Sequence, residues 1–119
     1  MTGNEILQRA LALLGYAENN GNLQLTQRIL QKALPIVNLV YADVSRMCGK
    51  DIKPLESLVD EIKTPISANT VFVCGVASYI AATEGDDANQ AFWGAEYATR
   101  KTTLTRITEV KDSLPVPEY

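Results

Sequence analysis

The sequence NTVFVCGVASYIAATEGDDANQAFWGAEY, residues 69–97, decides how the chain folds. It contains an uncharged apolar run at 71–82, an acidic break at 84–87, and a second apolar run beyond the break. A helix that is apolar on nearly every face is buried on all sides in a folded protein. We therefore predict a helix from about residue 68 to residue 84 that is ended by Gly85, is the most buried helix, and precedes another helix.

Capping residues indicate where these two helices begin. Ser67 is in position to cap the apolar helix, and Asp87 with Gln90 resembles a capping box with aspartate at the N-cap of the last helix. Threonines lower the helix propensity toward the end of the last helix. We therefore predict a helical domain at 1–107 and an extended tail at 108–119, which contains two prolines.

Two apolar stripes run along the last helix. The residues expected to face inward are Ala91, Phe92, Ala95 and Ala98. The second stripe consists of Trp93, Tyr97, Leu104 and Ile107. Trp93 and Tyr97 either fill the core or anchor an interface, where aromatic residues are enriched.

Upstream of this stretch, the pattern predicts two more helices. The first is short, begins with a capping box made by Thr2 and Glu5, and ends at Gly15. A polar loop at 16–22 precedes a long helix at 23–47, whose apolar stripe keeps its phase across Pro35. A proline inside a helix removes one backbone hydrogen bond and causes a kink or a break, and the continuous stripe favours one kinked helix over two.

The segment at 50–65 is ambiguous. Leu55, Leu58, Val59 and Ile62 fit a helical pattern, but prolines bracket the segment. We favour extended or irregular structure there over a helix. The sequence as a whole predicts a single all-α domain of four helices.

Composition excludes several classes of function. The chain has 119 residues, a net charge of −3 and no histidine, so the commonest general base and metal ligand is missing and a dedicated nucleic-acid binder is disfavoured. Cys48 and Cys74 lie in no metal-binding spacing, and we expect buried, reduced thiols. No signal peptide is recognisable, and the run at 71–82 is shorter than a membrane span, so we expect a protein made in the cytosol, without membrane contact.

We find no motif for nucleotide binding, nucleophilic catalysis or metal binding, and expect neither an enzyme nor a cofactor. Glu84, Asp86 and Asp87 either bind a cation weakly or form a turn and a helix cap, and the second interpretation is favoured. The basic cluster formed by Arg100, Lys101 and Arg106 is either a solvated helix end or a contact with an acidic partner or DNA backbone.

The order of these features resembles the small helical head–tail connector, or adaptor, proteins of tailed bacteriophages and prophages. The resemblance covers roughly residues 6–101. It is carried by L-L-G at 13–15, I-V-N-L-V-Y-A-D-V at 36–44, L-E-S-L-V-D-E-I-K-T-P at 55–65, and V-C-G-V-A-S-Y-I-A-A at 73–82 followed by E-G-D-D-A-N-Q-A-F-W. The proline in the long helix and the threonine-rich last helix depart from the family pattern.

The resemblance implies a structural protein of the virion neck. Copies would form a ring, usually of twelve, under the portal protein, with a downstream neck or tail protein as a further partner and DNA as passing cargo. It implies that the last helix and the tail contact other subunits or the portal. The residues expected at this interface are Phe92, Trp93, Tyr97, Arg100, Lys101, Leu104, Arg106, Leu114, Val116 and Tyr119. The alternatives are another phage neck or tail-completion protein and a small helical partner-binding regulator of a bacterial cell.

Overall fold

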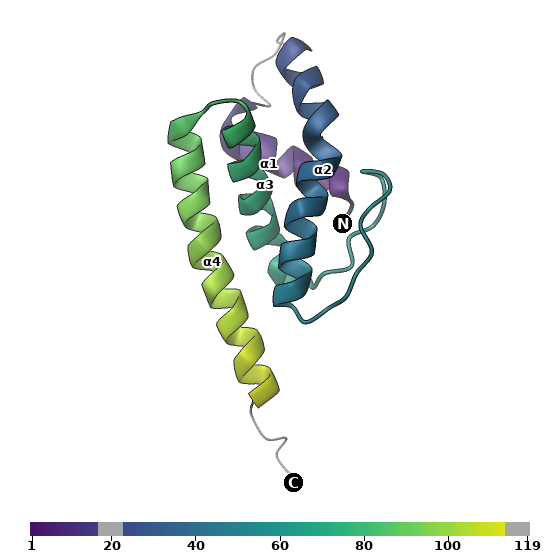
Figure 1. Cartoon of the computed structure of the whole chain (residues 1–119), viewed down its shortest axis with the longest axis vertical. Coiled ribbons are helices and arrows are strands. Elements are labelled where there is room, and N and C mark those ends of the chain that lie inside the picture. The colour runs from purple at the N-terminus through teal and green to yellow at the C-terminus, as the bar shows by residue number, and fades with distance from the viewer. Residues whose placement is uncertain (17–22, 114–119) are drawn as a thin grey trace.

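The computed structural model describes residues 1–16 and 23–113, with side chains over 1–16 and 27–105. It contains α1 (Gly3–Leu14), α2 (Leu23–Met47), the short 3-10 helix η2 (Ile66–Ala68), α3 (Asn69–Thr83) and α4 (Asp87–Ser113). The described residues form no strand, only an isolated bridge between Thr2 and Glu61. This confirms the predicted all-α fold of four helices (Figure 1).

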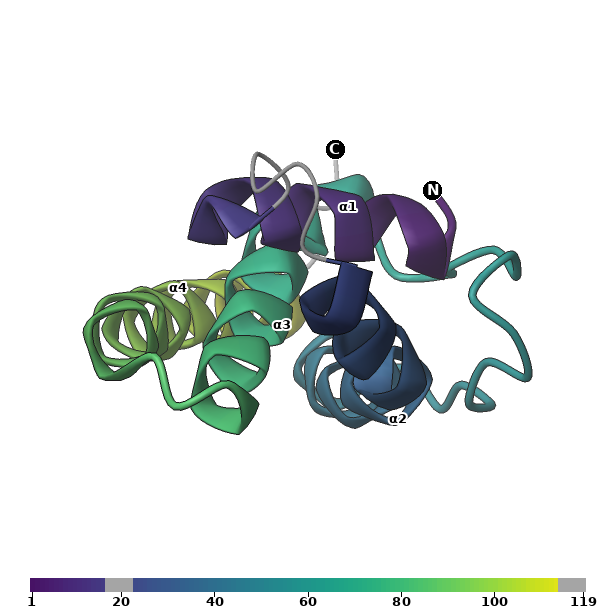
Figure 2. The ribbon, with the colours of Figure 1, turned by 90° about the horizontal axis from the view of Figure 1, so that it is seen from above.

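Helix α3 is the centre of the molecule. It lies between α2 and α4, and α1 packs across one side of α2 and α3 (Figure 2). Ten of its fifteen residues are buried, which confirms that it is the most buried helix. The segment Ile66–Thr83 is long and apolar enough to cross a membrane. The core helices of soluble proteins meet the same two criteria, and just over half of this segment is buried inside the protein.

Helix α1 has the ends that its sequence predicts. The Glu5 N–H donates to Thr2 Oγ1 at 3.2 Å, and Gly15 adopts a left-handed conformation with φ of 78°. The apolar side of α1 is buried against the rest of the bundle. Because a helix of twelve residues is marginal on its own, this packing stabilises it.

Helix α2 is continuous through Pro35, which confirms one helix rather than two. Pro35 lies on the exposed side of α2. The carbonyl of Gln31, which loses its helical donor to the proline, therefore lies on a side that water reaches. The buried side of the helix continues from Ile29 to Val44 without interruption.

The segment between α2 and η2 is irregular, as we favoured, and is fixed by specific contacts. Asn38 on α2 donates from Nδ2 to the Leu55 carbonyl at 2.9 Å and accepts the Leu55 N–H on Oδ1 at 2.7 Å. The Tyr41 hydroxyl accepts the Lys63 N–H at 2.9 Å. Leu55 and Ile62 are buried, so the linker contributes to the core although it has no helix.

Two predicted caps are wrong in detail. Ser67 does not cap α3, because the 3-10 turn that follows Pro65 leads directly into the helix, whose N-cap is Ala68 without a side-chain hydrogen bond. Gly85 follows α3 in a left-handed conformation, as predicted. The cap of α4 is Asp86 rather than Asp87, since Asp86 Oδ1 accepts the Asn89 N–H at 3.3 Å.

Helix α4 continues to Ser113, so the predicted start of an extended tail at residue 108 is wrong. Each threonine costs only a few tenths of a kcal/mol in a helix, and no proline occurs between Asp87 and Pro115. The Thr102 and Thr103 hydroxyls donate to the carbonyls of Ala98 and Thr99, which satisfies them within the helix. The rest of the predicted tail, 114–119, lies outside the described residues.

Both cysteines are free thiols. Cys74 is buried in α3, and Cys48 is half-buried at the end of α2. Burial raises the pKa of the Cys74 thiol, which keeps it protonated and unreactive.

Candidate interaction surface

The inward side of α4 is formed by the stripe that contains Trp93, Tyr97 and Leu104, for which the sequence allowed either a core or an interface role. Tyr97 and Leu104 are each 8% exposed, and Trp93 is half-buried against the core. The prediction that Ala91, Phe92, Ala95 and Ala98 face inward is wrong, because all four are exposed. Trp93, Tyr97 and Leu104 together remove more apolar area from water than one phenylalanine and three alanines would. The stripe with the larger side chains therefore packs against the core.

The opposite side of α4 is exposed and uncharged over about four helical turns. We call it the outer α4 face. It consists of Ala88, Ala91, Phe92, Ala95, Ala98, Thr99, Thr102 and Thr103. Phe92 is 56% exposed, and its ring packs edge-on against Trp93 with 4.7 Å between centroids. The solvent side of a surface helix usually carries charged residues, so this uncharged side with an exposed aromatic ring is our candidate for an interaction surface.

The direction of this face is set by close packing between α3 and α4. Gly75 lies where the two helices meet. A Cβ atom at Gly75 would lie 2.7 Å from Val40 Cγ1 and 2.8 Å from Tyr97 Cε1. The absent side chain thus makes room for the Tyr97 ring and lets α4 approach α3.

A polar cluster then ties α4 to α2. The Tyr97 hydroxyl donates to Asp43 Oδ2 at 2.5 Å, and Lys101 Nζ donates to the same oxygen at 3.0 Å. The Lys101 ammonium also lies 5.1 Å from the centre of the Tyr97 ring. Burial and the hydrogen bond to Asp43 raise the pKa of Tyr97 well above its ordinary value. Burial alone would raise the pKa of Asp43, but the donors Tyr97 and Lys101 lower it overall.

These contacts change the role of several residues expected at an interface. Tyr97 and Leu104 are buried within the subunit, and Lys101 pairs with Asp43, so all three side chains hold α4 to the rest of the subunit. Trp93 backs the outer α4 face from inside, and Phe92 belongs to that face.

Other predicted interface residues lie beside the outer face or beyond the described side chains. Arg100 is exposed and pairs with Glu96 at 3.2 Å. The side chain of Arg106 and the whole of Leu114, Val116 and Tyr119 lie outside what the structure describes. The alanines and threonines of the outer face were not predicted at an interface, although their helical spacing and lack of charge could have indicated it.

The acidic break is a turn and a cap, as we favoured. Asp86 accepts from the Tyr16 hydroxyl and from Asn89 Nδ2, each at 2.7 Å, and Asn89 also donates to the Leu14 carbonyl at 3.3 Å. These hydrogen bonds, above all the one from Tyr16, lower the pKa of Asp86. Glu84 pairs with Arg28 at 3.1 Å. In the described part of the chain, no three acidic, cysteine or histidine side chains group to hold a metal ion.

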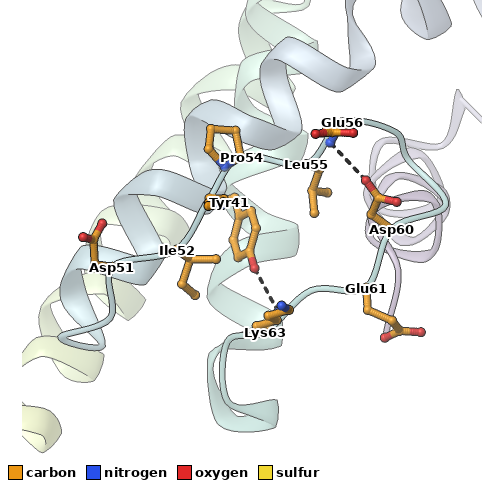
Figure 3. Close-up of a pocket in the computed structure, with 10 residues that line it drawn as sticks. Tyr41, Asp51, Ile52, Pro54, Leu55, Glu56, Asp60, Glu61 and Lys63 are labelled. Atoms are coloured by element: carbon orange, nitrogen blue, oxygen red, sulfur yellow. Dashed lines mark hydrogen bonds between the residues drawn. The ribbon is translucent and has the colours of Figure 1, made fainter.

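A groove that the sequence did not predict lies between α2 and the linker (Figure 3). It has a volume of about 630 Å³ and includes Tyr41, Pro54, Leu55, Asp60 and Lys63 in its lining. Two of its polar side chains, Asp60 and Tyr41, hold the linker. Asp60 accepts the N–H groups of Glu56 and Ser57, each at 3.0 Å, and the Tyr41 hydroxyl holds Lys63. The groove therefore follows from how the linker is fixed.

The fold and this surface define a small all-α protein with an unpartnered helix face. No family model matches the chain, and the comparisons with curated proteins and with solved structures give no match either.

Proposed function

We propose that the protein is a structural subunit of the head–tail connector of a tailed bacteriophage, in which copies form a ring between the portal and the neck or tail. The observation that carries the proposal is the outer α4 face, which is uncharged, exposes Phe92, and has no role in the core of the subunit. The sequence patterns that resemble connector proteins support the same function.

The shape of the subunit suits such a role. It is elongated, with extents of 61 × 29 × 18 Å. Helix α4 has 27 residues, about 40 Å at the usual rise per residue. Its C-terminal end projects beyond the other helices (Figure 1). A projecting helix offers a second contact region, directed along the long axis, while the outer α4 face points sideways toward neighbouring copies.

The proposal is tested with the portal protein encoded by the same viral genome. We expect the purified full-length chain to bind the portal in size-exclusion chromatography with light scattering, and electron microscopy to resolve a ring of added mass under the portal. We also expect mass spectrometry to detect the chain in purified virions. No binding to the portal together with absence from virions would refute the function.

A matched pair of variants links this assay to the surface. Ala95→Glu places a charge in the middle of the outer α4 face, and Ile66→Glu adds the same charge at a residue that is 87% exposed elsewhere. We expect Ala95→Glu to lower ring occupancy on the portal at least tenfold and Ile66→Glu to leave it unchanged. Equal behaviour of the two variants would contradict a role for the face.

A further inference from the structure

A second uncharged face lies on the far side of the subunit. We call it the outer α2 face. It consists of Pro35, Leu39 and Ala42, which are exposed, and Leu39 is 53% exposed. Lys32 and Arg46 border this face and are exposed. Like the outer α4 face, it takes no part in the core of the subunit.

The two faces point away from each other. Helices α2 and α4 flank α3, and each turns its buried side toward the centre of the bundle (Figure 2). Both helices run in the same direction along the long axis, and the first half of α4 lies level with the second half of α2 (Figure 1). Rotation about an axis parallel to these helices therefore brings α4 of one copy beside α2 of the next, parallel and at the same level.

The chemistry of the two faces is complementary. Alanines on α4 permit close approach of a neighbouring helix, and Leu39 and Pro35 protrude from α2. Asp87 borders the outer α4 face at its N-terminal end, and Glu96 is paired there with Arg100, whereas the exposed charges bordering the outer α2 face, Lys32 and Arg46, are basic. Opposite charges at the rim of an interface favour this pairing over others.

We propose that the outer α4 face of each copy packs on the outer α2 face of the next copy, so that the subunits join head to tail. This inference rests on the proposed function and names the partner of its surface. Different patches on opposite sides of a subunit make a heterologous contact, which closes into a ring when the rotation allows. A contact between two α4 faces would instead stop at a dimer.

The size of the face predicts how the ring forms. From Ala88 to Thr103 the outer α4 face is about 24 Å long and about 10 Å wide, or roughly 240 Å². Stable interfaces bury about 800 Å² on each partner. A single contact is therefore weak, and we expect assembly that depends on concentration and is completed when each copy uses both faces.

Cross-linking of the full-length chain tests the pairing. In a Cys48→Ser background, with Cys74 buried and unreactive, Leu39→Cys and Ala95→Cys are introduced singly and together and treated with a short bismaleimide. We expect a ladder of multimers from the double variant and at least fivefold less cross-linking from either single variant. The control double variant, Val59→Cys with Ala95→Cys, uses a residue that is 71% exposed in the linker and should give no ladder.

Two results would overturn the pairing. Dimers from Ala95→Cys alone, as abundant as those of the double variant and without larger species, would indicate contact between two α4 faces. Cross-linking of the double variant no stronger than that of the control would exclude contact between the α2 and α4 faces. The outcome is distinguishable from that of the proposed function. A ladder without portal binding, from a chain that is also absent from virions, refutes the connector function alone, and portal binding without a ladder refutes this pairing alone.

Discussion

Replacing Gly75 with alanine tests whether close packing fixes the direction of α4. A Cβ atom at this position would lie 2.7 Å from Val40 Cγ1 and 2.8 Å from Tyr97 Cε1. Carbon atoms in contact prefer about 3.5–4.0 Å, so each contact would be about 1 Å too short. Val40 is fully buried, and the Tyr97 ring is fixed through its hydroxyl by Asp43, so neither moves away freely.

Two opposing effects set the magnitude. Gly→Ala inside a helix stabilises it by about 1 kcal/mol, because alanine has the higher helix propensity. Extra carbon in a close-packed core costs about 1–3 kcal/mol, and two compressed contacts put Gly75→Ala near the upper end. We therefore expect a net loss of about 1–2 kcal/mol in the free energy of unfolding, or a fall of roughly 4–8 °C in Tm.

Gly94 provides the matched control. It lies inside α4, and a Cβ atom there would meet no atom within 4 Å. Gly94→Ala should therefore stabilise the protein by about 0.5–1 kcal/mol. The two variants share the propensity gain, so their difference, measured in urea melts followed by far-UV circular dichroism, isolates the steric cost. Equal stability of Gly75→Ala and Gly94→Ala would refute the packing argument.

Three further predictions concern polar contacts that hold α2, the linker and α4 together. Asn38→Ala leaves the N–H and C=O of Leu55 without partners, so we expect the free energy of unfolding to fall by about 2 kcal/mol; a loss under about 0.5 kcal/mol in urea melts would contradict this. Tyr97→Phe removes the hydrogen bond to Asp43 and should cost about 1 kcal/mol in the same assay, and an unchanged midpoint would argue against the bond. The pKa of Asp43 in the folded protein lies below its ordinary value of 3.8, so its stabilising effect is present above that pH and is lost as the pH falls through the lower folded value. Asp43→Asn should therefore flatten the decline of Tm with acidification below about pH 4, and a decline as steep as in the parent protein would count against it.

Local chemistry predicted the parts of the fold that depend on local interactions. The N-cap at Thr2 and the left-handed Gly15 and Gly85 follow from side-chain and backbone preferences within a few residues. The burial of α3 follows from its apolar residues on all sides. The cap of α4 was predicted one residue too late, at Asp87, although the N-cap hydrogen bond between Asp86 and the Asn89 N–H is also local. The further contact of Asp86 with Tyr16, seventy positions away, had no local signal.

Which side of α4 faces the core could not be decided from the helix alone. Both of its stripes are apolar, and the choice depends on the shape of α3, where Gly75 leaves room for a ring. The contact of Asp43 with Tyr97 and Lys101 spans more than fifty positions and has no local signal. The helix end at Ser113 was missed because weak propensity was treated as a stop, although a helix continues until a breaker or a cap ends it.

The outer α4 face is best explained by a role outside the fold of the subunit. Its residues bury little area in the monomer, and Gly75, Tyr97 and Asp43 fix α4 from the other side. A charged residue at Ala95 would therefore cost the monomer less than about 0.5 kcal/mol, as exposed substitutions usually do, and would improve its solubility. If this substitution leaves folding intact but abolishes assembly, the residues of the outer α4 face are required for assembly and not for the stability of the subunit. The neighbouring helix that we propose as the partner of this face would account for its lack of charge and its exposed phenylalanine, because the solvent side of a surface helix usually carries charged residues.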